Sequence, residues 1–396
     1  MQESGALLTD PMAVFAYLAG ILALVFWLSG IPRLHKLFEI LPPVIFAYFL
    51  PTLSTTFGIT PAASPVYAWM TRYLLPIALL LLMITTDLKS IARLGKIALV
   101  MMLTGTVGII IGGPIALLVF GAFLPPDAWQ GFAALSGSWI GGTANMVAIA
   151  ESVGTPEAAL GPIIVVDTVV GYGWMGVLLF LSAFQARFDR WNRADRSAID
   201  ATNRRLQEMD TKRHPLDTRM AVVIIGLGFA GAVLAIAIGN RMPSVGDPTI
   251  ISQTTWAVLV VVTGGLLLSL TPLRALEEWG ASRIGYAALY MLLTAIGAQA
   301  DLKAVLDAPV YLLAGALWIA IHVALLFGMA RLLRAPLFFV ATGSMANVGG
   351  AASAPVVAGV YHPAMAPVGL LMAVAGYVLG IYGGLICAWL LAQVAA

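Results

Sequence analysis

The stretch that decides the fold is "SGSWIGGTANMVAIAESVG", residues 136–154, which lies in an otherwise almost entirely apolar chain. It places Ser138, Thr143 and Asn145 around the pair Gly141–Gly142. Glycines weaken a helix and expose its backbone, and small polar side chains need hydrogen-bond partners that hydrocarbon does not supply. We therefore predict a helix that is broken within residues 136–146 and that binds something at the break.

The composition around this stretch is that of a helical membrane protein. Of the 396 residues, 60% are hydrophobic and only 10% are charged, and the mean hydropathy is +0.95. Soluble domains carry roughly 25% charged residues. The long apolar runs predict an all-α polytopic membrane protein in contact with the lipid bilayer, in the inner or plasma membrane, and a formal net charge of +2 gives no indication of nucleic acid binding.

About twelve apolar runs have the length of a membrane span, and the number of spans stays open at 11, 12 or 13. The runs form two groups, so we expect a first transmembrane repeat over 1–184, a charged cytoplasmic linker over 185–218 and a second repeat over 219–396. A solvated connector is the favoured interpretation of the linker, with a regulatory or lipid-binding helix as the alternative. The runs lie at 12–30, 39–56, 65–86, 97–121, 130–152, 159–184, 220–240, 253–271, 284–300, 309–330, 336–358 and 365–394.

The two halves resemble each other. "SWIGGTAN" at 138–145 aligns with "ANVGGAAS" at 346–353, and an Asp-Leu-Lys triplet recurs at 87–89 and at 301–303. Two matches in the same order indicate an internal repeat. The second repeat should then carry its own broken helix near 343–354, and helix breaks at corresponding positions of two halves point to a transporter binding site.

The basic loops suggest that the repeats are inverted. They lie near 33–36 and 89–96 in the first half, and near 274–283 and 331–334 in the second. By the positive-inside rule the first half starts outside and the second half starts inside. Six crossings per half cannot produce that arrangement, so one segment between 128 and 218 is miscounted, and the broken run is the prime candidate.

A helix broken at two glycines leaves free N–H groups on one half-helix and free C=O groups on the other, which suit an anion and a cation respectively. The alternative is that small residues only let helices pack closely. The candidate substrate- or ion-binding residues at the two breaks are Ser138, Gly141, Gly142, Thr143, Asn145, Ser344, Asn347, Gly349, Gly350 and Ser353.

Five ionisable residues outside the breaks need an interpretation. Asp167 lies about ten residues into an apolar run, where a charged carboxylate is costly unless it is paired, solvated or bound to a cation. His322, with an unperturbed pKa of about 6.5, is a candidate proton relay or partner of Asp167, and equally a packing residue. Arg72 is expected to reach the membrane interface rather than a substrate. Glu151 and Glu157 are expected to be boundary charges, with Glu151 on an ion path as the less favoured alternative.

The quoted stretch resembles the broken crossover helix of the bile acid:sodium symporter family, and "MITTDLKSIARLGK" at 83–96 resembles the end of that family's panel helix. As a whole the chain resembles the YjcL-like integral membrane protein family, which is grouped with those symporters and with cation:proton antiporters. The resemblance implies inverted structural repeats, panel and core domains, and two broken crossover helices that cross at the membrane midplane. In the antiporters a carboxylate on the helix after the crossover carries the ion, and Asp167 matches that position.

The chain departs from the symporters at the second break, where "SMANVGGAASAPVV" has neither the acid nor the glutamine that hold sodium in that family. A proton carried by Asp167, or a candidate Na⁺ site at Thr143, Asn145 and Asp167, fits the residues present. No other cofactor is expected. Catalytic motifs are missing from the sequence, so we do not expect an enzyme.

The function predicted from the sequence is secondary active transport by alternating access of a small organic anion or zwitterion, coupled to H⁺ or Na⁺. One alternative is a cation:proton antiporter without an organic substrate. The other is a membrane sensor or scaffold that transports nothing and binds a partner through its linker. A homodimer is a candidate assembly.

Overall fold

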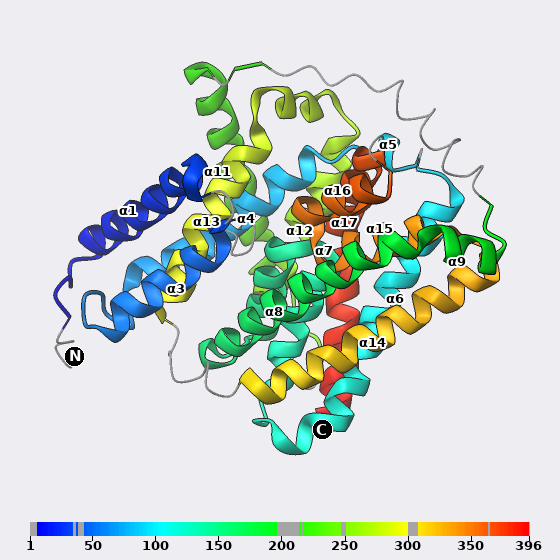
Figure 1. Cartoon of the computed structure of the whole chain (residues 1–396). Coiled ribbons are helices and arrows are strands. Elements are labelled where there is room, and N and C mark those ends of the chain that lie inside the picture. The colour runs from blue at the N-terminus through cyan, green and yellow to red at the C-terminus, as the bar shows by residue number, and fades with distance from the viewer. Residues whose placement is uncertain are drawn as a thin grey trace.

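The computed structural model is helical over the part of the chain that it describes (Figure 1). In that part the β-structure is one isolated bridge between Val245 and Ile251. Most of the predicted linker and the Asp-Leu-Lys triplet at 301–303 lie outside the described residues. The described residues are 6–34, 37–38, 43–92, 94–195, 214–215, 217–246, 251–299, 308–362 and 365–395.

Two helices of the first half begin at a capping residue that precedes an apolar run. The carboxylate of Asp10 accepts the N–H of Ala13, and Ser64 caps a helix whose first residue is Pro65. The helices are α1 (Pro11–Ser29), α3 (Pro43–Thr56), α4 (Pro65–Ile84), α5 (Leu88–Ala92), α6 (Lys96–Phe120), α7 (Ala128–Val153), α8 (Glu157–Leu181) and α9 (Gln185–Asn192).

In the second half, two helices also begin at capping residues. Asp217 caps its first helix, and Ser252 forms a capping box with Thr255 at the start of the next. The helices are α11 (Thr218–Gly239), α12 (Gln253–Ser269), the 3₁₀ helix η4 (Pro272–Trp279), α13 (Ala281–Gln299), α14 (Ala308–Leu333), α15 (Leu337–Val348), α16 (Gly350–Tyr361) and α17 (Ala366–Ala395).

Eight helices in the described residues are long and apolar enough to cross a membrane, or up to nine if η4 is counted with α12. The multi-pass membrane protein is thereby confirmed, but the predicted 11 to 13 spans are too many by this measure. At 14 and 17 residues, α3 and α12 are shorter than the other spans. The two segments with glycine pairs are interrupted, and each turns back on itself.

Helix α7 is a re-entrant hairpin, which we call hairpin 1. The carboxamide of Gln130 near its start donates to the carbonyls of Val153 and Gly154 at its end, at 2.9 and 3.0 Å. The hydroxyl of Thr155 donates back to the carbonyl of Gln130 at 3.1 Å. The limbs touch along their length, since a Cβ added at Gly137 would lie 2.7 Å from the carbonyl oxygen of Asn145.

Helices α15 and α16 form a second re-entrant hairpin, which we call hairpin 2. The ring of Phe338, near the start of α15, lies 6.3 Å from that of His362, just after the end of α16. The predicted breaks are therefore present, but the prediction of two crossover helices is wrong. In each hairpin the chain returns to the end from which it entered, because a limb of helix half the length of the segment cannot reach across a bilayer.

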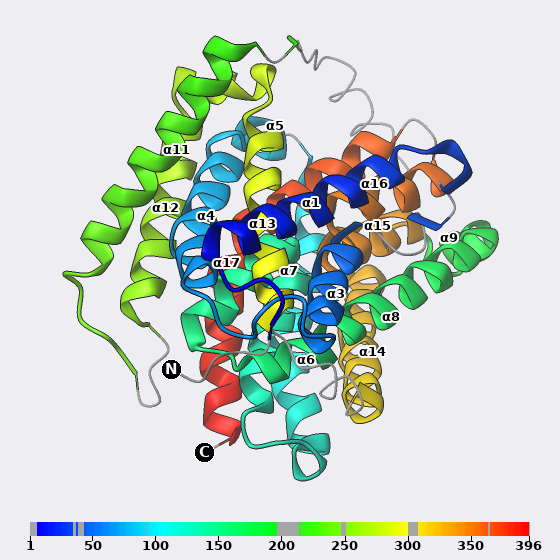
Figure 2. The same ribbon diagram turned by 90° about the vertical axis from the view of Figure 1, so that its left-hand side faces the viewer.

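The helices pack in two groups on either side of hairpin 1 and α17 (Figures 1 and 2). One group holds α1, α3, α4, α11, α12 and α13, with α11 and α12 on its outer flank. The other holds α6, α8, α14 and hairpin 2. Glycines on α17 and α6 allow close crossings: Gly380 lies against the side chain of Asn145 in hairpin 1, and Gly108 lies against His322 of α14.

The described loops at one end of α4 and α13 are joined by polar contacts. Arg274 of η4 pairs with Asp87, which follows α4, and His214 stacks on Trp279 of η4 at 4.5 Å. Basic residues gather in and beside these loops, at Lys89, Arg274 and Arg283. We call this end of the molecule the basic end.

Replacing Asn192 with alanine should lower the free energy of unfolding. Its fully buried carboxamide donates to the carbonyls of Ala330 and Ala335, at 3.0 and 2.8 Å, and so fastens α9 to the turn between α14 and α15. Each buried carbonyl left without a partner costs about 1–3 kcal/mol. A thermal melt in detergent should show a lower melting temperature for Asn192→Ala, and no change for Asn240→Ala, whose side chain is exposed.

Candidate functional site

The tips of both hairpins line one cavity of about 880 Å³, which we call the tip cavity. Its opposite wall comes from α1, α4 and α13, and Arg283 lies at the start of α13, near the basic end. Most of the lining is apolar, and four tyrosines are among the lining residues. The polar and glycine residues that line the cavity are Gly141, Gly142, Thr143, Asn145, Tyr172, Arg283, Tyr286, Tyr290, Gly349, Gly350 and Tyr377.

Each tip turns at a glycine in the left-handed region, Gly142 with φ of 76° and Gly350 with φ of 61°. Side chains other than glycine adopt this conformation at a cost, which explains the glycine in each hairpin. The first limb of a hairpin ends at its tip and the second limb begins there. Free C=O groups and free N–H groups of opposite partial charge therefore meet at the cavity.

Helix α17 holds the two tips together. A Cβ added at Gly376 would lie 2.5 Å from the carbonyl oxygen of Ile140 in hairpin 1 and 3.5 Å from that of Ala346 in hairpin 2. The next residue, Tyr377, accepts the backbone N–H of Ala351 at 3.2 Å, and its hydroxyl lies 3.3 Å from that of Tyr286 on α13. One turn of α17 thus contacts both tips and the opposite wall.

Asn145 has a buried carboxamide oxygen that no described residue contacts through a hydrogen bond. Its nitrogen donates to the carbonyls of Gly141 and Tyr377, which fixes the orientation of the amide. The side chain is 1% exposed, and its oxygen has no hydrogen-bond partner among the described residues. A buried carbonyl oxygen beside a cavity favours a ligand that donates a hydrogen bond or carries a positive charge.

Asn347 differs from Asn145, although both were predicted site residues. Its nitrogen donates to the carbonyls of Met102 and Gly343, and its oxygen accepts the hydroxyl of Thr106 at 2.8 Å. The amide is fully buried and fully bonded. It fastens hairpin 2 to α6 and does not line the tip cavity.

Asp167 lies behind hairpin 1 and does not line the tip cavity. The hydroxyl of Ser138, in the limb that leads to Gly141, donates to its carboxylate at 3.0 Å. The indole of Trp139 is beside the same carboxylate. Tyr172, five residues further along α8, does line the cavity. Of the predicted Na⁺ ligands, the cavity joins Thr143 to Asn145, and no described contact connects either to Asp167.

His322 and Ser344 belong to a chain of hydrogen bonds inside the core. The Nδ1 of His322 is 2.9 Å from the carbonyl of Gly105, so it must donate a proton there, and its Nε2 accepts the hydroxyl of Ser344 at 2.8 Å. The indole of Trp174 donates to the same hydroxyl at 2.8 Å. His322 therefore sits between Gly105 and Ser344 and not beside Asp167, so the predicted pairing of the two is not found.

The profile of the family described as "Protein of unknown function (DUF819)" matches residues 16–394, nearly the whole chain. The chain belongs to the DUF819 family. It is also 25% identical over 344 residues to the "Uncharacterized membrane protein YjcL" of Bacillus subtilis (strain 168), which covers 83% of this chain and 85% of that protein. The resemblance to YjcL-like membrane proteins is thus confirmed, and the relation to symporters and antiporters stays a prediction.

In this DUF819 protein, His322→Ala should weaken the fold without changing the response to pH. The substitution leaves the carbonyl of Gly105 and the hydroxyl of Ser344 without their partner, at about 1–3 kcal/mol for each group. We expect a lower melting temperature than for wild type or for His214→Ala, which removes an exposed histidine. A change in the pH dependence of ligand binding between about pH 5.5 and 7.5 would instead make His322 the proton carrier.

The cavity of this DUF819 protein contains residues that the sequence did not single out. Tyr286 and Tyr290 lie one turn apart on α13. Tyr377 follows Gly376, the glycine of α17 that contacts both tips. A tyrosine in an apolar run has many roles, from interface anchoring to packing. The only signal in the sequence was the spacing of Tyr286 and Tyr290, which places them on one face of a helix. This spacing indicates a binding site only when it is known that both tips face α13.

Proposed function

We propose that this DUF819 protein is a secondary active transporter that moves a small organic solute by alternating access. The observation that carries the proposal is the meeting of two re-entrant hairpins at one cavity. Irregular backbone at membrane depth is tolerated where it is buried in protein or lines a wet cavity, and such breaks hold substrates and ions in transporters. A scaffold has no need of paired half-helix ends around a space of about 880 Å³.

We further propose that the halves are inverted repeats. If each half contributes five crossings and one hairpin, its number of crossings is odd, and the halves enter the membrane from opposite sides. This resolves the conflict between six apolar runs per half and the distribution of the basic loops. Hairpin 1 then enters from the end opposite the basic end, and hairpin 2 enters from the basic end.

In this proposal the two groups of helices are a panel and a core. The panel consists of α1, α3, α4, α11, α12 and α13, and the core consists of α6, α8, α14, α17 and both hairpins. The tip cavity lies between them, with α13 on the panel side and Tyr377 on the core side. Movement of the core against the panel would then expose the tips to each side in turn.

The free N–H groups at the tips suit a carboxylate of the solute, and Asp167 is the proposed carrier of H⁺ or Na⁺. The bond from Ser138 to Asp167 is what supports coupling, because it connects the ion carrier to the limb that ends at Gly141. A change of charge on Asp167 would move that limb and therefore the tip. If Na⁺ binds at Thr143 and Asn145, Asp167 must move closer to these two residues to act as the third ligand.

Alternating access can be tested by labelling a cysteine at the tip from both sides of the membrane. Thr143→Cys would be placed in a Cys387→Ala background, because Cys387 is the single cysteine of the chain and is buried. A membrane-impermeant thiol reagent should label it in right-side-out and in inverted vesicles, with rates that change in opposite directions when a solute or ion is added. Labelling from one side under every condition would contradict the proposal.

The antiporter without organic substrate remains a second candidate, because Asp167 lies outside the tip cavity and needs no solute to titrate. Proteoliposomes with a trapped pH-sensitive dye separate the two functions. An antiporter should move protons when Na⁺ alone is added outside. The transporter proposed above should require an organic solute for the same signal.

A further inference from the structure

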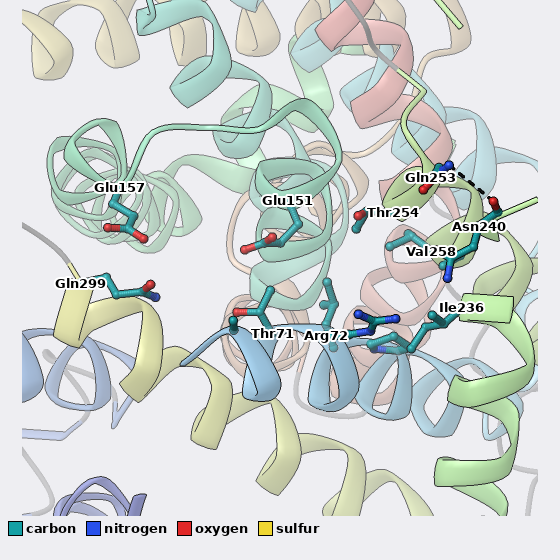
Figure 3. Close-up of a pocket in the computed structure, with 14 residues that line it drawn as sticks. Thr71, Arg72, Glu151, Glu157, Ile236, Asn240, Gln253, Thr254, Val258 and Gln299 are labelled. Atoms are coloured by element: carbon teal, nitrogen blue, oxygen red, sulfur yellow. Dashed lines mark hydrogen bonds between the residues drawn. The ribbon is translucent and has the colours of Figure 1, made fainter. Parts of the chain in front are cut away.

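A second cavity, of about 450 Å³, lies at the other end of the same helices, and we call it the outer cavity (Figure 3). It is lined by the first half of α4 and the end of α13, whereas the tip cavity is lined by the end of α4 and the first half of α13. On the core side it is bounded by Glu151, near the base of hairpin 1, and by Glu157, the first residue of α8. It therefore faces away from the basic end.

The polar side chains of the outer cavity are sorted by charge. Figure 3 shows the carboxylates of Glu151 and Glu157 on one side, with the amide of Gln299 below them. The guanidinium of Arg72 lies on the other side and extends toward Asn240. The cavity thus has an anionic end and a cationic end, formed by helices of both groups.

In the described part of the chain, no ion pair joins the charged side chains that line the outer cavity, which are Arg72, Glu151 and Glu157. The guanidinium carbon of Arg72 lies 5.8 Å from the centre of the ring of its neighbour Tyr73. Opposite charges that line one cavity without meeting are complementary to a ligand that carries both charges itself.

We propose that the outer cavity binds a small zwitterion, with its ammonium group between Glu151 and Glu157 and its carboxylate at Arg72. A plain organic anion meets two carboxylates here and is repelled, and a plain cation leaves Arg72 without a partner. This binding site needs no assumption about transport. Its role as the outer entrance to the tip cavity rests on the proposed function, and it narrows the transported solutes to zwitterions.

The test compares ligands of one size and different charge on the purified full-length protein. Isothermal titration would use 4-aminobutyrate, butyrate and n-butylammonium, with glycine and 6-aminohexanoate to vary the distance between the charges. We expect a zwitterion to bind at least tenfold more tightly than the ions with a single charge, which is about 1.4 kcal/mol. With Arg72→Gln, the zwitterion should bind no more tightly than butylammonium. With the double variant Glu151→Gln, Glu157→Gln, the zwitterion should bind no more tightly than butyrate. Arg219 is exposed and lies at the other end of the molecule, so Arg219→Gln should leave every affinity unchanged.

The outcomes separate this inference from the proposed function. If no zwitterion binds, or if butyrate binds equally well, the inference is overturned. Zwitterion binding that survives Arg72→Gln and is lost in Asn145→Ala would place the ligand at the tips, which overturns the outer site and supports the proposed function. Binding that depends on Arg72, in a protein whose Thr143→Cys is labelled from one side only, would support the outer site and contradict transport.

Discussion

Asp167→Asn is expected to abolish the coupling of solute binding to H⁺ or Na⁺ while leaving the protein folded. Asparagine keeps an oxygen that can accept the hydroxyl of Ser138, so the contact between α8 and hairpin 1 survives. It removes the charge that a cation or proton neutralises, and couplings between two ligands are worth about 1–3 kcal/mol, or 5- to 150-fold in affinity. The variant should lose that factor, and its melting temperature should equal or exceed that of wild type, because a charged carboxylate inside a membrane protein is costly.

Thermal shifts with and without Na⁺ at two pH values measure this prediction. Protons and Na⁺ compete for one carboxylate, so a wild-type stabilisation by Na⁺ should grow as the pH rises and should be missing from Asp167→Asn. Asp127→Asn is the matched control, because Asp127 lies in the turn before hairpin 1 and its side chain caps no backbone group. If Asp167→Asn responds to Na⁺ and pH as wild type does, the ion is carried elsewhere.

Gly376→Ala is expected to inactivate the protein by separating the two hairpin tips. The added methyl group would lie 2.5 Å from the backbone oxygen of Ile140, and backbone cannot rotate away as a side chain can. Such overpacking costs about 1–3 kcal/mol of stability. The displacement also reaches Ala346 and Tyr377, so ligand binding at the tips should fall by more than the loss of stability alone would cause.

Gly328→Ala on α14 is the matched control for Gly376→Ala. It is the same substitution in another helix of the proposed core, and nothing lies within 4 Å of the added atom. Because alanine favours helix over glycine by about 1 kcal/mol, this control should melt at the same temperature or higher. Equal ligand affinity in Gly376→Ala and wild type would show that the tips need not touch α17.

The sequence predicted the positions of both breaks because the conformation there is local. Gly142 and Gly350 adopt positive φ, and a pair of glycines inside an apolar run is a direct sign of such a turn. The direction that the chain takes after the turn is set by contacts between residues far apart in the sequence. A crossing helix and a re-entrant hairpin leave the same apolar run in the sequence, and the return of hairpin 1 is seen only in contacts between its limbs, such as that of Gln130 with Val153.

The site was predicted in part for a similar reason. Thr143 and Asn145 reach the cavity because they are next to the break, which the sequence shows. His322 and Asp167 were both recognised as polar residues inside apolar runs, yet pairing them required knowing how each helix is rotated about its axis. Considered separately, Arg72 was interpreted as a charge that reaches the membrane interface and Glu151 as a charge at the boundary of a helix. They become a site only when α4 and the base of hairpin 1 enclose one space.

The two cavities at opposite ends of α4 and α13 have an electrical consequence. If water fills both cavities, it carries the potentials of the two compartments inward, and the membrane voltage falls mainly across the protein that separates them. One elementary charge that crosses the whole voltage exchanges about 2.3 kcal/mol per 100 mV. A charge that moves only between Glu151 and the tip of hairpin 1 would then cross most of this voltage, although it passes only the second limb of hairpin 1.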